Sequence, residues 1–230
     1  MNGVVDYYEK VQDKQRDALF AGLICWTYIP FALQGKKANR LRLDYEDDKN
    51  PANNNYFIDE IDLNSYDPTK EQSLRHIGLK TDEFGLVIGY KRRKCILLSD
   101  PIAEESYPIP GVQGFSVVPL YSVHDENGDY RHSINRETVL RAQAYQCNHI
   151  FYLPDSTEFD AHESFARLDR IEFANLEIIF PTNVKLTKTA LDLLRQWTWH
   201  YQGFPFLDKP LVDYMQMAKD KLNNSLGGSQ

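Results

Sequence analysis

A cluster of four cations, Lys91, Arg92, Arg93 and Lys94, is the most distinctive group of charged side chains in this sequence. It stands directly before an apolar run, residues 95–98, of the length typical of a buried strand. Cations at the mouth of such a strand are the first groups that a polyanion would meet. The planar fork of an arginine can also hold a phosphate through two hydrogen bonds. The cluster therefore indicates a surface for RNA or for a protein partner.

A second apolar run, residues 115–123, contains Tyr121 and Ser122, and His124 follows directly after it. Because histidine titrates near neutrality, His124 is a candidate general acid beside Ser122. Each residue also has a simpler interpretation: Arg93 as a solvated strand end, Tyr121 as a packing ring, Ser122 as a turn serine and His124 as a surface histidine. The histidines show no metal-ligand spacing, and we expect neither a metal nor another cofactor.

The composition indicates one well-filled core. The chain has 230 residues, of which 42% are hydrophobic, so we expect a single domain over residues 1–230. The cysteines, Cys25, Cys95 and Cys147, are far apart, odd in number and embedded in apolar segments, which favours buried reduced thiols. No apolar run approaches the roughly 20 residues that cross a bilayer. Since the N-terminus also lacks the order of a signal peptide, we expect a cytoplasmic protein without a membrane segment.

The negative charge of the chain is concentrated in one segment. The formal net charge is -7, and residues 44–83 alone hold eleven acids against four bases, so the remainder is balanced. Turn-forming residues dominate this region. We interpret residues 36–83 as a long acidic insertion, mostly on the surface, in which Arg40 to Tyr45 could form an edge strand.

Short apolar runs bounded by turn residues predict a mainly β fold with flanking helices. Glu126 to Asp129 (ENGD) adds a hairpin turn signal. Thr187 is a candidate N-cap for a helix in which residues 190, 191, 194, 197 and 201 are apolar at helical spacing. We expect strands within residues 22–31, 84–123 and 147–173, and helices at 4–20, 136–146, 187–201 and in a C-terminal extension, residues 204–224.

The order of these segments resembles the MazF/PemK toxin family over roughly half of the chain. Four stretches carry the resemblance, and they occur in the family's order. They are GLICWTYIP (residues 22–30), RKCILLSDP (93–101), VVPLYS (117–122) and SFARLDRI (164–171), followed by the helix that begins near Thr187.

The resemblance implies a small SH3-like barrel, commonly a homodimer, that cleaves single-stranded RNA without a metal. In that chemistry an arginine stabilises charge on the phosphate, and a nearby threonine or serine hydroxyl assists. Arg93 takes the arginine position, and Lys94 stands where the family usually has proline. Tyr121 occupies the threonine position, with Ser122 next to it. A phenol oxygen would lie several ångströms from a threonine hydroxyl, and Ser122 would point to the opposite face of the strand unless a bulge re-aims it.

Two hypotheses follow, and the sequence leaves both open. In the first, the chain is a non-catalytic regulatory or protein-binding module in a prokaryotic toxin–antitoxin or defence-signalling system. In the second, it is a metal-independent toxin endoribonuclease for single-stranded RNA, restrained by an antitoxin. Tyr121, Lys94 and the acidic excess favour the first hypothesis, because losing the hydroxyl position harms chemistry more than folding.

Overall fold

The protein is mainly antiparallel β with flanking helices, as the sequence predicts. The computed structural model describes residues 6–15, 18–30, 37–45, 55–62, 85–100, 114–131, 134–205 and 208–227. The chain divides into two compact units, residues 1–29 with 92–230, and residues 30–91. The described residues form an eight-stranded sheet, a three-stranded sheet and three α-helices. The predicted insertion, residues 36–83, falls within the second unit.

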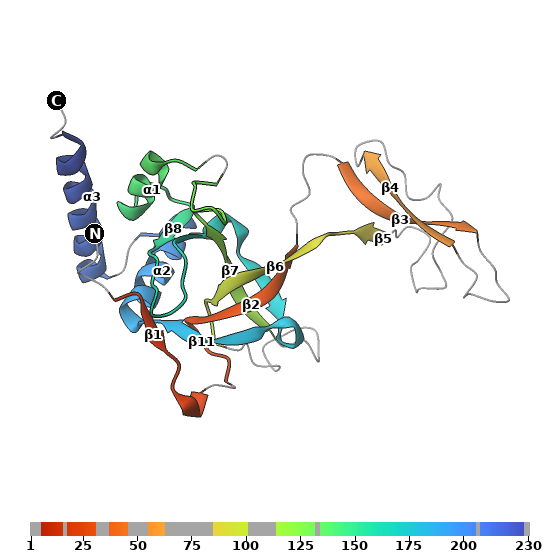
Figure 1. Ribbon diagram of the computed structural model, residues 1–230, viewed down its shortest axis with the longest axis horizontal. Helices are drawn as coiled ribbons and strands as arrows, with labels where there is room; N and C mark the ends of the chain where they lie inside the picture. Colours follow the sequence, from red (N-terminus) through yellow and green to blue (C-terminus); the bar gives the residue numbers. More distant parts are fainter. Residues whose placement is uncertain are drawn as a thin grey trace. The chain divides into compact units, whose positions relative to one another are not determined.

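The larger sheet has the strand order β1–β11–β2–β6–β7–β9–β8, and β10 also pairs with β7 (Figure 1). Since β1 and β8 are its two edges, the sheet is open, and the closed barrel that the resemblance implies is not confirmed. The strands are β1 (Tyr8–Lys10), β2 (Leu23–Pro30), β6 (Tyr90–Leu97), β7 (Gly114–Ser122), β8 (Ile150–Leu153), β9 (Ser164–Arg167), β10 (Glu172–Asn175) and β11 (Phe180–Leu186).

The central strands β2, β6 and β7 are apolar along consecutive positions because both faces of the sheet are covered. Ile96 and Val118 belong to a core cluster that includes the inner side chains of helix α2 (Lys188–Tyr201). Their neighbours Cys95 and Val117 belong to a second cluster on the other face. All four side chains are completely buried. Burying an aliphatic side chain of this size contributes about 1.5–3 kcal/mol to the free energy of unfolding. These three strands therefore fix the position of the other strands of the sheet.

Helix α2 forms as its sequence predicts and anchors the edge strand β8. The Thr187 hydroxyl caps it by accepting a hydrogen bond from the backbone nitrogen of Ala190 at 3.2 Å. Trp197 is 1% exposed, and its Nε1 donates to the carbonyl oxygen of Ile150 at 2.9 Å. The other helices are α1 (Arg136–Gln143) and α3 (Lys209–Gly227). None of the helices in the described ranges is both long and apolar enough to cross a membrane.

Side chains join the two edges of the larger sheet where the backbone does not. The hydroxyl of Tyr8 on β1 donates to the carbonyl oxygen of Pro154, just after β8, at 2.8 Å. The rings of Tyr7 and Phe151 lie 6.4 Å apart across the same opening. Helix α3 packs here through Met215, which is 2% exposed. The C-terminal extension therefore folds back onto the first unit.

Two expectations for the elements were wrong, and one strand was missed. Residues 4–20 contain strand β1 and a 3₁₀ turn, Asp13–Gln15, instead of a helix. The predicted edge strand is β3 (Lys37–Tyr45), which lies at the centre of the smaller sheet, between β4 (Asn55–Asp62) and β5 (Gly85–Val87). Strand β11 was not expected, because FPTNVKL begins with a Phe-Pro pair and is half polar.

All three cysteines are free thiols, and two of them are core residues. Cys25 and Cys95 are fully buried, as predicted, whereas Cys147 is only partly buried. Burial raises the pKa of the Cys25 thiol to about 12. The pKa of Cys95 is raised too, first by burial and then by the neighbouring Cys25. Because the thiolate is the reactive form, both side chains act here as small apolar residues.

The contact between the sheet edges gives a stability prediction. Replacing Tyr8 with Phe removes its hydroxyl and leaves the Pro154 carbonyl without this donor, which costs about 0.5–1.5 kcal/mol of the free energy of unfolding. Urea denaturation should show this loss. Tyr28→Phe, which removes the hydroxyl of a tyrosine that is 41% exposed, is the matched control and should change the free energy of unfolding very little. Equal stability of the two variants would show that the Tyr8 hydroxyl does not hold the edges together.

Candidate functional site

The cations that the sequence singled out lie on β6 where this strand leaves the core. Its side chains change from exposed at Arg92 to fully buried at Cys95. Because successive side chains of a strand point to opposite faces, Arg93 lies on one face, with Arg92 and Lys94 on the other. Lys91 is exposed. The cluster is therefore divided between two surfaces.

On the first face, the Arg93 guanidinium lies over the ring of Tyr121, with its central carbon 4.2 Å from the ring centroid. The register of β6 and β7, in which Cys95 pairs with Pro119, sets Arg93 opposite Tyr121. The guanidinium of Arg167 on β9 is 5.6 Å from the same ring. A cation over a tyrosine ring is attracted by the negative ring face.

The two arginines beside Tyr121 differ in their charge partners. Arg167 donates two hydrogen bonds to Asp169, at 2.7 and 2.6 Å. The hydrogen bond to Arg167 holds the pKa of Asp169 below its usual value, so this carboxylate stays charged and balances Arg167. Arg93 has no ion pair among the described residues. Within the described ranges, the flat face of Arg93 rests on Tyr121 and no carboxylate pairs with its N–H groups.

On the second face, two cations and three aromatic rings form what we call the aromatic–basic patch: Trp26, Tyr28, Arg92, Lys94 and Phe180. Trp26 and Phe180 are directly opposite in the register of β2 and β11. Arg92 lies 5.2 Å from the Trp26 ring centroid and 5.4 Å from that of Phe180. The Lys94 ammonium is 5.6 Å from Trp26 and donates to a backbone carbonyl at 3.0 Å. Tyr28 and Phe180 are 41% and 43% exposed, so the patch is open to solvent.

The remaining candidates lie apart from Arg93. Ser122 pairs in register with Ser164 of β9 and is next to Tyr121 in the strand, so it points to the opposite face. His124 lies beyond the end of β7, with its ring stacked on Tyr130 at 4.9 Å. Within the described ranges, no hydrogen bond or ion pair joins Ser122, His124 and Arg93 to one another. The structure therefore brings together Arg93 and Tyr121 only.

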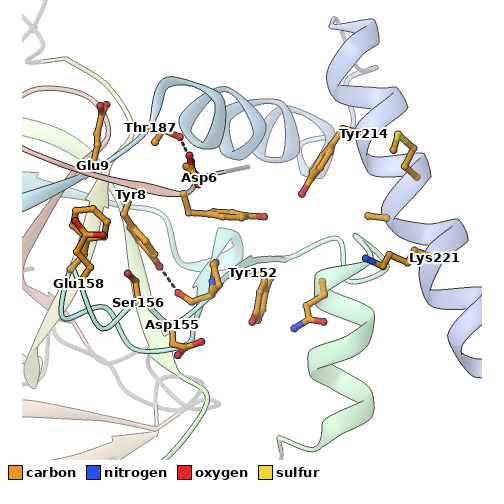
Figure 2. Close-up of a pocket in the computed structure, with 16 residues that line it drawn as sticks. Asp6, Tyr8, Glu9, Tyr152, Asp155, Ser156, Glu158, Thr187, Tyr214 and Lys221 are labelled. Carbon is orange, nitrogen blue, oxygen red and sulfur yellow. Dashed lines mark hydrogen bonds between the residues drawn. The ribbon is translucent and has the colours of Figure 1, made fainter. Parts of the chain in front are cut away.

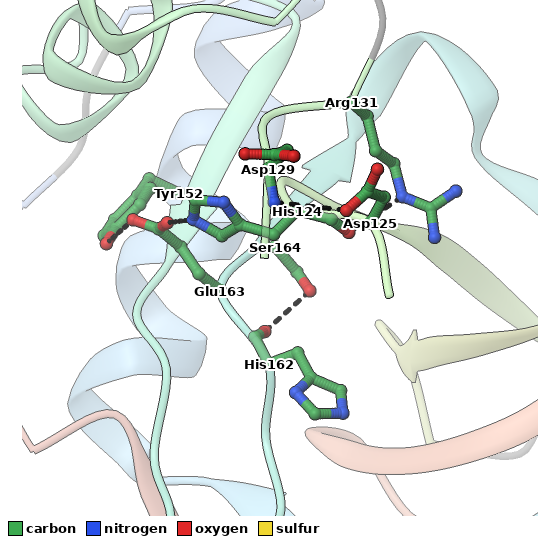
Figure 3. A network of polar contacts seen from close by, with 8 residues as sticks. All are labelled: His124, Asp125, Asp129, Arg131, Tyr152, His162, Glu163 and Ser164. Carbon is green, nitrogen blue, oxygen red and sulfur yellow. Dashed lines mark hydrogen bonds and ion pairs between the residues drawn. The ribbon is translucent and has the colours of Figure 1, made fainter. Parts of the chain in front are cut away.

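His124 belongs to a hydrogen-bonded network that the sequence did not indicate (Figure 3). Its Nε2 lies 2.6 Å from one carboxylate oxygen of Glu163, and the hydroxyl of Tyr152 lies 2.6 Å from the other. Because an ionised carboxylate only accepts hydrogen bonds, both partners donate to Glu163. The network joins the end of β7 to strand β8. Its members are 11 and 39 residues apart from Glu163 in the chain, so no local spacing marks them.

No protein-family model, no curated protein and no solved structure matches this chain. Within the residues that the structure describes, no group of three or more His, Cys, Asp or Glu side chains could hold a metal ion. The candidate site is therefore defined by its own geometry: one arginine held on a tyrosine ring, and an aromatic–basic patch on the opposite face of the same strand.

The Glu163 network gives a second stability prediction. In Glu163→Gln the amide oxygen can accept from only one of His124 and Tyr152, and the other must accept from the amide nitrogen, so both charge-assisted hydrogen bonds are replaced by weaker neutral ones. We expect a loss of about 1–3 kcal/mol in the free energy of unfolding, measured by urea denaturation. Glu126→Gln makes the same change in an exposed turn and is the control. A Glu163→Gln protein as stable as this control would exclude a structural role for the network.

Proposed function

We propose that this chain is a non-catalytic, protein-binding regulatory module of the MazF/PemK-like type, a small SH3-like barrel in origin. The function would belong to a prokaryotic toxin–antitoxin or defence-signalling system, in the cytoplasm. Its partner docks on the aromatic–basic patch. The observation that carries this proposal is the pairing of Arg93 with the Tyr121 ring, in the position where the resemblance calls for a small hydroxyl side chain.

The separation of the polar groups supports a non-catalytic role. Phosphoryl transfer needs a charge-stabilising donor and a proton-transferring group directed at the same few atoms. Tyr121 presents its ring face to Arg93, while Ser122 points to the other side of β7. His124 is held by Glu163 at 2.6 Å. These groups do not converge on one point.

The aromatic–basic patch has the composition of a protein interface. Tryptophan, tyrosine and arginine are the residues that most often carry binding energy at interfaces. The cations already lie against the rings, Arg92 over both Trp26 and Phe180, so a nucleobase would have to displace them before it could stack. An acidic side chain with an apolar neighbour meets no such obstacle, because it can bind the cations from outside and cover the ring edges. This favours an acidic, partly apolar protein segment as the ligand.

A second candidate function, a metal-independent endoribonuclease for single-stranded RNA, rests on one specific observation. Arg93 has no ion pair among the described residues, and its face is held by Tyr121. An arginine arranged in this way can still donate two hydrogen bonds to a phosphate. In this candidate Arg93 would stabilise charge on the phosphate, and the hydroxyl of Ser122 or Tyr121 and the His124 imidazole would have to move toward it.

Incubation with RNA decides between the two candidates. We expect purified protein to leave single-stranded RNAs of varied sequence intact in EDTA, because no hydroxyl or base of the described residues forms a hydrogen bond or ion pair with Arg93. Cleavage that leaves a 2′,3′-cyclic phosphate and is lost in Arg93→Ala would reject the non-catalytic proposal. The loss in that case should be about 100- to 1,000-fold, the typical effect of removing one preorganised charge-stabilising donor.

Two variants that make the same change from tryptophan to alanine, Trp26→Ala and Trp199→Ala, test the docking surface. Affinity purification from cells should recover one protein with wild type and with Trp199→Ala, but not with Trp26→Ala. Trp199 is a suitable control because it is 39% exposed on α2 and its ring stacks on Phe204, which does not belong to the patch. With that purified partner, Trp26→Ala should raise the Kd by about 30-fold or more, the usual effect of truncating a central aromatic anchor. Equal affinity of the two variants would show that the partner binds elsewhere.

A further inference from the structure

A pocket of about 770 Å³ opens where the two edges of the larger sheet approach each other (Figure 2). Its walls are β1, the segment that follows β8, and helices α1 and α3. A pocket of this volume is large enough for a small organic ligand. It is separate from the aromatic–basic patch, and it shares no residue with the docking surface proposed above.

Aromatic rings form the main wall of this pocket: Tyr7, Tyr8, Tyr152, Phe159 and Tyr214. Most of the hydroxyl groups already have partners. Tyr8 donates to the Pro154 carbonyl at 2.8 Å and Tyr152 to Glu163 at 2.6 Å, while Tyr7 is hydrogen-bonded to Tyr214. Figure 2 shows the side chains of Tyr8, Tyr152 and Tyr214, the last on α3, around the pocket. The walls therefore offer ring surfaces to a ligand, and ring faces attract cations.

Carboxylates dominate the charged part of the lining. Four acids, Asp6, Glu9, Asp155 and Glu158, stand against one base, Lys221. Glu9 is neutralised by Lys185 at 3.1 Å. The three other acids have no ion pair within the described ranges, and they are exposed at the rim. The rim therefore carries uncompensated negative charge next to aromatic walls.

We propose that this pocket binds an aliphatic polyamine cation. Its ammonium groups would lie against the tyrosine rings and near Asp155 and Glu158, and its methylene chain would cover the apolar parts of Pro154 and Met217. A pocket that combines aromatic rings with carboxylates favours a polyamine over a metal ion and over an anion. A metal ion gains little from ring faces when it keeps its water shell, and an anion is repelled by the rim.

Isothermal titration calorimetry with spermidine, at constant ionic strength, tests the proposal. We expect saturable binding with one site per chain. The double variant Asp155→Asn/Glu158→Gln should weaken it by about tenfold, since each exposed carboxylate contributes up to about 1 kcal/mol. The matched control, Glu126→Gln/Glu177→Gln, removes the same charge from exposed positions outside the pocket lining and should bind as wild type does.

Two further measurements separate this site from general attraction to a negatively charged protein. First, Mg²⁺ at the same ionic strength should not displace spermidine. Second, Phe159→Leu, which keeps every charge, should weaken spermidine binding severalfold. Circular dichroism should show that this variant keeps its fold. Equal weakening in both double variants, or displacement by Mg²⁺, would overturn the proposal. Because neither result involves the aromatic–basic patch, failure here leaves the proposed function unaffected.

Discussion

Burial of the central strands on both faces is the constraint on which the rest of this structure depends. Ile96 and Val118 pack toward α2, and Cys95 and Val117 pack on the other side. A strand enclosed in this way can carry charged side chains only where it leaves the core. On β6 that point is reached at Arg93 and Lys94, which are half-buried. The charged end of the strand is therefore a consequence of how far the core extends.

Long cationic side chains that emerge from a core have apolar stems to cover, and here they lie on aromatic rings. Arg92 rests against Trp26 and Phe180, and Arg93 rests against Tyr121. Contacts of this kind contribute about 0.5–1 kcal/mol each at exposed sites, so they add little to stability. Their larger effect is to restrict the cations to fewer conformations, so that under the proposed function less entropy would be lost on binding.

The sequence predicted those parts of the fold in which local pattern and tertiary packing agree. The apolar run of β2 and the helical spacing of α2, with Thr187 as its cap, are of this kind. Strand β1 was missed because only Tyr8 of its three residues is buried. So short a strand shows no alternation of apolar and polar residues in the sequence. The residues of the candidate site likewise differ in whether the sequence alone could indicate them. Arg93 could be found from the basic cluster and Tyr121 from the resemblance of its strand, whereas Glu163 becomes relevant only through partners that are distant in the chain.

The side chain at position 121 decides how freely the neighbouring arginine can move. The position lies opposite Arg93 in the register of β6 and β7, so any side chain there faces the guanidinium. A small hydroxyl residue would leave the arginine free to move and would place a proton donor or acceptor beside it. The tyrosine ring, with its centroid 4.2 Å from the central guanidinium carbon, instead covers the guanidinium face. Tyr121 therefore acts as a support that orders the Arg93 cation.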